Sequence, residues 1–397
     1  MTSNNKLNIL MAHTQGGGVG YYRFWLPAKA LRDLGHDVTY FTGEFDFYHD
    51  IHNNTGLEPA QWIEQQYKSD QRYDIFHNGY STVIGHVKFA ATLRNYAQQA
   101  FDSDLHVLVD IDDDPYSVPS YNPSFNKYRR TSDEKKNLLI HLRTSDAVSV
   151  TMPPLVSIIK QDAPATYLLP NYCEPLDWDH FPRDPQRDDD KSIRIMYCGG
   201  VGHYGDLATI KEVIERVMAK YDGKERPMVR LFWLGCTPDW TLPYMLDKVN
   251  PLANRAFYIQ PCHINTYWRA IRWISPDILI APVECNEFNK SKSDIKAYDA
   301  VIGNSAFLCT DWDTYDQLPQ GTCFKARGDV QWQCTLEALI EDKSLRQQSA
   351  SKLREFVFDT RQIKHHIYKW VDVYRDLISR PPKSTLDDMV RPVIYRP

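Results

Sequence analysis

Hydrophobic positions in the first 170 residues fall into short apolar runs, which are separated by longer stretches with helical periodicity. The apolar runs are "KLNILMA", "HDVTYFT", "YDIFHN", "LHVLVDI", "DAVSV" and "ATYLLP". Such short, nearly continuous runs are typical of strands buried on both faces of a parallel sheet. The stretches "YYRFWLPAKALRDLG" and "VIGHVKFAATLRNYAQQA" are typical of amphipathic helices that cover a sheet. The pattern therefore predicts βα units.

The same rhythm begins again after an interruption at residues 171–192. This segment, "NYCEPLDWDHFPRDPQRDDDKS", concentrates proline and aspartate without periodicity, which is typical of an interdomain linker. Further strands are expected at "SIRIMYC", "MVRLFWLG", "AFYIQ", "PDILIAPV" and "SAFLCT". One apolar helical face combines Leu207, Ile210, Val213, Ile214, Val217 and Met218. A last helix is expected near residues 360–379.

Length and rhythm together predict two domains. The expected fold class is α/β, with two Rossmann-like doubly wound domains that face a cleft, because ligands of such sheets bind outside the carboxyl ends of the strands. The expected divisions are an N-terminal domain at 1–175, a linker at 176–192, a second domain at 193–360, a C-terminal helix at 361–380 and a tail at 381–397. The helix at 361–380 is a candidate to pack back on the first domain.

Composition narrows the class of partner. The 397 residues carry a net charge of −5, so no global basic field draws the chain toward nucleic acid or an anionic membrane, and only a local basic patch stays open. The eight cysteines form no C-x-x-C pair, which fits a reducing compartment. The N-terminus lacks a signal-peptide pattern, and no run approaches the roughly 20 apolar residues of a membrane span. We therefore expect a cytoplasmic protein.

A glycine-rich turn follows the first expected strand, in "AHTQGGGVGYYRFWLPAKAL". The backbone amides of Gly17 and Gly18 can approach an anion there, and the positive end of the following helix favours negative charge. Tyr21, Tyr22 and Arg23 stand where a dinucleotide-binding turn would place its third glycine, which weakens a nicotinamide-cofactor interpretation. A tight βα turn without a ligand is the alternative.

The second domain repeats this arrangement in "IRIMYCGGVGHYGDLATI", where Gly199, Gly200 and His203 precede a helix. Two such turns in one chain indicate a ligand whose phosphate is bound from both sides. His203 is a candidate for a phosphate or sugar contact, and capping of the helix is its alternative role.

The segment at residues 276–311, "PDILIAPVECNEFNKSKSDIKAYDAVIGNSAFLCTD", carries the most specific pattern. A buried strand ends in a polar loop, a helix follows, and a glycine then precedes another strand. Lysine and serine side chains at a helix start suit a pyrophosphate whose charge grows as a bond to it breaks. The donor-binding candidates of this segment are Asn289, Ser291, Lys292, Ser293, Lys296 and Asp299. A solvated, charged helix face is the alternative.

Taken in order, the first glycine turn, "GHDVTYFT", "GGVGH", "APVECNEFNKSKSDIK" and "VIGNSAFLCTD" make the chain resemble the GT-B glycosyltransferases of the group 1 (family 4) type, especially a branch found in bacteriophage genomes. The resemblance implies a nucleoside-diphosphate-sugar donor held mainly by the second domain and an acceptor held mainly by the first. It also implies transfer with retention at the anomeric carbon, with no obligatory metal or other cofactor. Lys292 is the catalytic candidate at the donor.

Two departures from that family's pattern bear on the donor site. Members place a glutamate five residues before the glycine that precedes the last core strand, and here Tyr298 occupies that position, with Asp299 one step later. The basic pair that members often carry after the first strand of the second domain is replaced by His203 alone. Lys292 is expected to supply the missing positive charge, with Lys290 or Lys296 as the alternatives.

Four aspartates, Asp110, Asp112, Asp113 and Asp114, stand where the strand "LHVLVDI" ends. A metal site of the D-x-D type fits a glycosyltransferase fold with one nucleotide domain, and two alternating halves oppose that fold. Asp113 and Asp114 precede Pro115 and are expected to cap the following turn. Asp112 is the catalytic candidate that binds or deprotonates an acceptor hydroxyl, and Asp110 is a further acceptor-binding candidate.

Aromatic and basic residues interleave in the loop after these aspartates. Aromatic faces stack on sugars and on extruded bases, and lysine and arginine follow phosphates. In an enzyme of the bacteriophage type, this loop points to a hydroxymethylated pyrimidine in DNA as the acceptor, and a saccharide or glycan acceptor is the alternative. A solvated loop with incidental charges is the third interpretation. The other acceptor-binding candidates are Arg23, Tyr116, Tyr121, Arg129 and Arg130. A sugar-nucleotide-binding protein without catalysis is the alternative from a different class.

Overall fold

The computed structural model describes residues 6–13, 17–42, 56–57, 61–62, 64–65, 72–236 and 255–383. The chain divides into two compact units. Unit 1 comprises residues 1–118, 125–173 and 363–397, and unit 2 comprises residues 119–124 and 174–362. The chain therefore passes into unit 2 after Cys173 and returns to unit 1 at Ile363.

Unit 1 is built around a six-stranded sheet in the order β2-β1-β3-β4-β5-β6, in which all neighbouring strands are parallel. The strands are β1 (Asn8–His13), β2 (Asp37–Thr42), β3 (Ile75–Gly79), β4 (His106–Ile111), β5 (Ala147–Val150) and β6 (Thr166–Leu168). Every residue of β4 and β5 is buried, as expected for interior strands of a sheet with helices on both faces.

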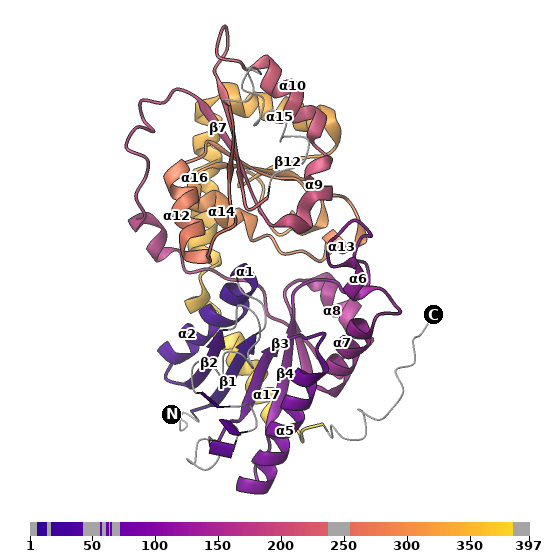
Figure 1. Cartoon of the computed structure of the whole chain (residues 1–397). Coiled ribbons are helices and arrows are strands. Elements are labelled where there is room, and N and C mark those ends of the chain that lie inside the picture. The colour runs from indigo at the N-terminus through magenta and orange to yellow at the C-terminus, as the bar shows by residue number, and fades with distance from the viewer. Residues whose placement is uncertain are drawn as a thin grey trace. The chain divides into compact units, whose positions relative to one another are not determined.

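Helices cover both faces of this sheet (Figure 1). They are α1 (Gly17–Val19), the π-helix η1 (Gly20–Trp25), α2 (Leu26–Asp33), α5 (Ile84–Phe101), α6 (Phe125–Tyr128), α7 (Asp133–Thr144), α8 (Pro153–Ile159), the 3₁₀-helix η7 (Ile363–His365) and α17 (Tyr368–Ile378). Leu93 of α5, Leu138 of α7 and Val109 of β4 share one core. On the opposite face, the hydroxyl of Tyr374 in α17 lies 2.8 Å from Nδ1 of His77 in β3.

Unit 2 contains a second parallel sheet of six strands, in the order β12-β11-β10-β7-β8-β9. Its strands are β7 (Ile193–Cys198), β8 (Val229–Leu234), β9 (Ala256–Ile259), β10 (Ile278–Ala281), β11 (Ala306–Thr310) and β12 (Phe324–Ala326). The interior strands β7, β10 and β11 are buried along their whole length. Their apolar runs therefore need cover on both faces.

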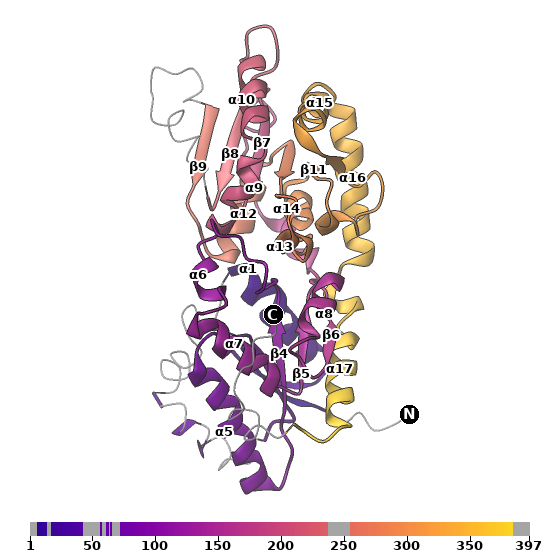
Figure 2. The ribbon, with the colours of Figure 1, turned by 90° about the vertical axis from the view of Figure 1, so that its right-hand side faces the viewer.

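The helices of unit 2 supply that cover. They are η2 (Pro175–His180), η3 (Val201–His203), α9 (Tyr204–Ala208), α10 (Lys211–Lys220), α12 (Ile264–Ile274), α13 (Glu287–Lys290), α14 (Lys296–Gly303), η6 (Asp313–Tyr315), α15 (Gly328–Glu341) and α16 (Lys343–Thr360). In Figure 1, α12, α14 and α16 lie on one face of the sheet, and α10 and α15 lie on the other. Figure 2 shows α16 beside β11.

Local sequence determines several helix ends. Ser132 caps α7 by accepting a hydrogen bond from the Lys135 amide at 3.1 Å, and Asp342 caps α16 by accepting one from the Leu345 amide at 2.9 Å. Helix α14 ends where Asn304 adopts a left-handed conformation with a φ of 55°. These short-range signals fix where the long helices begin and where the chain turns back into the sheet.

Each strand that the apolar runs predict is present, and the expected α/β class with two Rossmann-like sheets is confirmed. Strand β12 is not among the predicted strands, because its central residue is Lys325 and its sequence forms no apolar run. The stretch interpreted as a linker, 176–192, is overlapped at its start by the 3₁₀-helix η2.

The helix expected near residues 360–379 begins later than its apolar spacing indicates. Helix α16 continues to Thr360, and the amide of Ile363 then donates to the carbonyl oxygen of Cys173 at 2.9 Å instead of to the preceding helical turn. Only from Tyr368 does α17 begin. The part of the expected tail at 384–397 lies outside the described residues.

Candidate functional site

In unit 2, the second glycine turn and the C-terminal motif meet at the carboxyl edge of the sheet. Strand β7 ends at Cys198, and Gly199 and Gly200 lead into η3 and α9. Strand β10 ends at Ala281 and leads through α13 into α14. Because parallel strands end at the same edge, these two connections lie next to each other, where ligands bind in sheets of this kind.

Gly199 allows an approach that a larger residue would prevent. A Cβ atom at this position would lie 2.5 Å from the hydroxyl oxygen of Tyr197 and 3.0 Å from the Nζ atom of Lys296. From the other side, a Cβ atom at Gly235 would lie 2.5 Å from the carbonyl oxygen of Gly199. The turn after β7 is therefore closely packed on two sides.

Lys296 is the first residue of α14, and its ammonium group lies against this turn. Its Nζ atom donates to the carbonyl oxygen of Cys198 and lies 4.8 Å from the centre of the Tyr197 ring. Burial lowers the pKa of Lys296, and the carboxyl group of Asp299 opposes that shift. A diphosphate bound beside the turn would favour the charged ammonium form.

Asp206, in the first turn of α9, links the two connections. Its Oδ2 atom lies 2.6 Å from Nδ1 of His203. Its Oδ1 atom accepts hydrogen bonds from the Glu284 backbone amide and from the Asn289 side-chain amide, both at 2.8 Å. Sequence reasoning did not identify Asp206 or Glu284 as site residues. The available signal was the spacing of three residues between His203 and Asp206, which places both at one helix start.

His203 has a neutral imidazole at pH 7. Burial, together with the charges of Lys296 and Lys292, lowers its pKa to about 4, although the hydrogen bond with Asp206 opposes the shift. Because a carboxylate only accepts hydrogen bonds, Nδ1 of the neutral ring carries the proton and Nε2 presents a lone pair. Of the two expected contacts, this tautomer favours a sugar hydroxyl over an ionised phosphate oxygen.

Asp299 lies one helical turn after Lys296, on the same face of α14. Its Oδ2 atom accepts a hydrogen bond from the Tyr267 hydroxyl at 2.7 Å. Burial raises the pKa of Asp299 to about 6, while the charge of Lys296 and the Tyr267 hydrogen bond oppose the shift. Tyr298, which stands at the position of the family's glutamate, is 1% exposed. The carboxyl group beside the lysine is therefore that of Asp299.

The other residues of the motif differ in exposure. Asn289 is buried and makes the bond to Asp206 described above, and Ser291 is buried and donates to the carbonyl oxygen of Phe288 at 3.0 Å. Lys292 is half-buried, with Nζ 4.6 Å from the centre of the Phe288 ring, and Ser293 is half-buried. Asn289 and Ser291 thus shape the loop, and donor contact by any of the four stays a prediction.

The first glycine turn belongs to unit 1. Gly17 has a φ of 70°, which favours glycine, and a Cβ atom at Gly17 or Gly18 would meet no atom of the described residues within 4 Å. The residues that replace the third glycine, Tyr21, Tyr22 and Arg23, are buried in η1. Anion binding by the amides of this turn stays a prediction.

Arg23 and Asp110 form an ion pair inside unit 1. Nε of Arg23 donates to Oδ1 of Asp110 at 2.9 Å and Nη2 donates to Oδ2 at 2.6 Å, with side chains 1% and 2% exposed. The Ser149 hydroxyl donates to Asp110 at 2.5 Å, and Nη1 of Arg23 donates to the Leu169 carbonyl oxygen at 2.5 Å. Burial raises the pKa of Asp110, but the pair with Arg23 outweighs burial and holds that pKa below its ordinary value. The pair ties η1 to β4, and acceptor contact by either residue stays a prediction.

The aspartates after Asp110 have different surroundings. Asp114 is buried, and its Oδ1 atom accepts a hydrogen bond from the Tyr116 amide at 2.8 Å, which confirms its role in the turn. Asp112 is half-buried just after β4 and lines a narrow pocket together with His13 and Tyr80. Asp112 therefore stands at the carboxyl edge of the sheet in unit 1.

Part of the aromatic and basic loop is engaged internally. The Tyr116 hydroxyl donates to Asp162 at 2.5 Å, and Nζ of Lys135 lies 3.7 Å from the centre of the Tyr116 ring. Tyr116 and Lys135 therefore contact other groups of unit 1. The exposed acceptor candidates of the loop are Tyr121, Arg129 and Arg130.

Among the described residues, no three histidine, cysteine, aspartate or glutamate side chains gather as ligands for a metal ion. No helix in the part of the chain that the structure describes combines the length and apolarity needed to span a membrane.

Comparison with known proteins gives matches in structure. No protein-family model and no curated protein matches the sequence. Sucrose-phosphate synthase from Thermosynechococcus elongatus has a TM-score of 0.62 at 14% identity, covering 94% of this chain and 100% of that chain. A glycosyltransferase from Rickettsia africae has a TM-score of 0.62 at 15% identity, covering 95% and 100%. HepE from Anabaena, in complex with UDP-glucose, has a TM-score of 0.59 at 10% identity, covering 92% and 100%.

These matches extend over both units and nearly the whole length of each chain. With the two parallel six-stranded sheets, they establish the class: the chain has the GT-B fold, as the sequence predicts. At identities of 10 to 15% the likeness shows the fold alone, so the activity has to be argued from the residues.

Proposed function

We propose that the chain is a glycosyltransferase that transfers a sugar, with retention at the anomeric carbon, from a nucleoside diphosphate to an acceptor hydroxyl. Unit 2 holds the donor and unit 1 holds the acceptor. The fold shared with a glycosyltransferase and with a protein crystallised with UDP-glucose supports the proposal. UDP-glucose is therefore the first donor to test.

One observation carries the proposal: two lysines and a carboxyl group gather around the turn after β7. Lys296 contacts the turn, Asp299 lies on the same helix face, and Lys292 is close enough to His203 to lower its pKa. As the bond between the sugar and the diphosphate of the donor lengthens, negative charge develops on the departing diphosphate. Positioned ammonium groups in a partly dry site stabilise that charge more than water does.

The neighbouring polar groups suit the uncharged parts of the donor. Asp299 and Tyr267 together present a carboxyl oxygen and a hydroxyl to the hydroxyl groups of a ribose. Nε2 of the neutral His203 ring accepts a hydrogen bond from a hydroxyl of the transferred sugar. In unit 1, Asp112 accepts a hydrogen bond from the acceptor hydroxyl and orients it for attack.

For the acceptor we propose a saccharide. A hydroxymethylated pyrimidine in DNA, which the resemblance to a bacteriophage branch raises, is the second candidate. Binding to duplex DNA rests on many cationic contacts to phosphates, and the net charge of −5 gives no general attraction. In the loop, Tyr116 and Lys135 contact each other, which leaves fewer groups for bases and phosphates.

The test incubates the full chain with UDP-, GDP- and dTDP-sugars. Acceptors are a panel of mono- and oligosaccharides and duplexes that contain hydroxymethylcytosine or hydroxymethyluracil. Released nucleoside diphosphate is assayed, products are weighed by mass spectrometry, and NMR of the product gives the anomeric configuration. A product heavier by one sugar supports transfer and names the acceptor class. Absence of both diphosphate release and product with all three donors contradicts the proposal and favours a binding protein without catalysis.

The Lys292→Ala variant connects this activity to the site. Loss of one positioned cation should lower turnover by about 10²–10³-fold, on the scale of a lost oxyanion donor. Lys290→Ala is the matched control, because Lys290 is two residues away and its Nζ atom pairs with Glu287 at 2.6 Å. Equal turnover in the Lys292→Ala variant and the wild type would remove Lys292 from the mechanism.

A further inference from the structure

Unit 2 contains a polar cavity at the edge of its sheet opposite to the glycine turn. The cavity has a volume of about 740 Å³. Its wall includes Ser192 and Ile193 where β7 begins, Asp277 just before β10, Asn304 just after α14 and Lys343 at the start of α16. The six residues of β7 separate it from the candidate donor site by roughly 20 Å.

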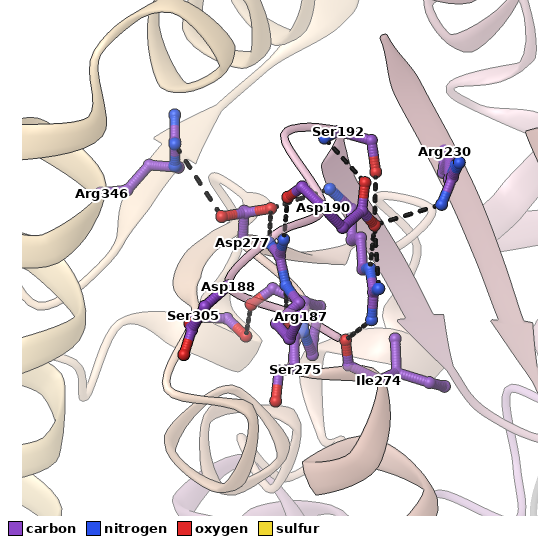
Figure 3. A network of polar contacts seen from close by, with 12 residues as sticks. Arg187, Asp188, Asp190, Ser192, Arg230, Ile274, Ser275, Asp277, Ser305 and Arg346 are labelled. Carbon is purple, nitrogen blue, oxygen red and sulfur yellow. Dashed lines mark hydrogen bonds and ion pairs between the residues drawn. The ribbon is translucent and has the colours of Figure 1, made fainter. Parts of the chain in front are cut away.

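Positive charge prevails in this cavity. Six cationic side chains line it, against three carboxylates. All three carboxylates are paired with arginines, and Figure 3 shows the pairs around Asp190 and Asp277. Asp277 is paired with Arg187, and Asp190 accepts hydrogen bonds from Arg194 at 2.8 Å and from Arg230 at 3.1 Å. Asp277 also lies 3.8 Å from Arg346, Asp188 lies 3.9 Å from Arg183, and Arg354 pairs with Asp179, which does not line the cavity. Lys191 and Lys343 are thus the lining cations without an ion partner among the described residues.

Arg346 and the two lysines present their charges to the cavity differently. Arg346 is 7% exposed, and its Nη1 atom is anchored on the carbonyl oxygens of Leu339 at 2.5 Å and Ile340 at 3.0 Å, so its guanidinium is held in place. Lys191 and Lys343 are exposed, and neither has an ion partner among the described residues. A fixed guanidinium beside two unpaired lysines is suited to an anion with more than one negative charge.

One face of α16 lines the cavity, beginning with Lys343 in its first turn and continuing through Arg346. Gln347 and Ser351 follow on the same helix and also line the cavity. Their amide and hydroxyl groups are suited to the uncharged part of a ligand.

We propose that this cavity binds a small organic molecule that carries at least two phosphate charges, such as a sugar bisphosphate or a nucleotide. The volume lies within the range of small-molecule sites, whereas nucleic acid requires an extended positive surface. The proposal does not depend on the glycosyltransferase activity, because none of the residues argued above belongs to the donor site. It assigns a second anion site to unit 2.

Isothermal titration with inorganic pyrophosphate tests the site. The experiment uses the full chain with Lys292→Ala, which weakens competing binding of pyrophosphate at the donor site. We expect one binding event per chain, weakened at least tenfold by adding Lys191→Ala and Lys343→Ala together, which corresponds to about 1.4 kcal/mol. Titrations with fructose 1,6-bisphosphate and ADP then distinguish a sugar phosphate from a nucleotide.

Lys211→Ala in the same background is the matched control. Lys211 is an exposed lysine at the start of α10 and does not line the cavity. Its removal should leave the affinity unchanged, and thermal unfolding checks that each variant is folded. The proposal is overturned if the two cavity substitutions leave the pyrophosphate affinity unchanged. It is also overturned if a short DNA duplex, but no small phosphate, binds through these lysines.

Discussion

Replacing Lys296 with methionine separates the binding of a diphosphate from the stability of unit 2. Methionine keeps the length of the side chain and its contact with Tyr197, but removes the ammonium group. Two unit charges about 4 Å apart interact by roughly 4 kcal/mol at an effective dielectric constant near 20. We therefore expect kcat/KM for the donor to fall by about 10²–10³-fold, or roughly 3–4 kcal/mol of transition-state stabilisation.

The stability of the same variant should change little. The substitution removes the hydrogen bond to the carbonyl oxygen of Cys198, which is worth about 1 kcal/mol. It also removes a cation whose charged form burial disfavours. Asp299 loses its charged neighbour, but its pKa is already raised to about 6, so this carboxyl group can take up a proton instead of staying charged and unpaired. The favourable and unfavourable effects oppose each other, so the free energy of unfolding should stay within about 1 kcal/mol of the wild type.

Donor turnover and urea unfolding, measured on the same preparations, check both expectations. Lys290→Met is the control for removing a lysine from this segment, because Lys290 pairs with Glu287 at the surface. The reasoning is refuted if Lys296→Met retains turnover within threefold of the wild type. A loss of several kcal/mol in unfolding free energy with unchanged donor affinity would assign Lys296 to the scaffold.

Three further variants test groups with shifted pKa values. Asp299→Asn should raise the unfolding free energy at pH 7 by roughly 2–3 kcal/mol, because burial raises the pKa of Asp299 to about 6 and penalises its charged form. As the pH falls from about 6 toward 3.8, the unfolding free energy of the wild type should rise by the same roughly 2–3 kcal/mol, whereas that of the variant should not rise. For His203 the trend is opposite. As the pH falls from 6.5 toward 4, the wild type should lose roughly 3 kcal/mol of unfolding free energy, because the unfolded chain binds a proton that the folded imidazole does not. His203→Gln should remove this loss. Asp110→Asn should lower the unfolding free energy by about 3–5 kcal/mol, because Arg23 stays buried without its counter-charge.

Urea unfolding between pH 4 and pH 8 measures all three. If Asp299→Asn leaves the pH dependence of the unfolding free energy unchanged, the carboxyl group has the same pKa in the folded and unfolded chains, which contradicts the prediction. An unchanged pH dependence below pH 6.5 in His203→Gln would contradict the prediction for the imidazole. For the ion pair, the double variant Arg23→Met with Asp110→Leu should lose less stability than Asp110→Asn alone. An equal or larger loss would show that packing, rather than an unpaired charge, dominates.

The fold could be predicted because its signals are local and repeated. Each buried strand is a short apolar run, and several turns after strands carry a local signal, such as Gly199 after β7 and the capping residue Asn286 after β10. The break between α16 and α17 escaped the prediction for the opposite reason. Apolar spacing continues past Thr360, but the amide of Ile363 bonds to Cys173, which is 190 residues away in the chain. A contact between residues so far apart does not alter the local hydrophobic periodicity, so the sequence pattern does not reveal it.

The candidate site was predictable only where its residues stand in one segment. His203, Lys292, Lys296 and Asp299 are all in the two motifs that follow β7 and β10. Tyr267 is not, because it reaches Asp299 from α12, and nothing in its own sequence neighbourhood marks it. The role of a residue that acts through a long-range contact becomes visible only in the folded chain.

The spacing of the C-terminal motif has to be counted from Lys296 rather than from the glycine at its end. Measured back from Gly303, the position of the family's glutamate falls on Tyr298, which carries no carboxylate. Measured forward, Asp299 is three residues after Lys296, so the two share a helix face, and each perturbs the pKa of the other. A carboxylate at position 298 would instead enter the core, where a tyrosine ring is 1% exposed. The start of α14 therefore determines which helix face meets the glycine turn. The carboxylate is one residue later than in the family, and it still lies on the same face as Lys296.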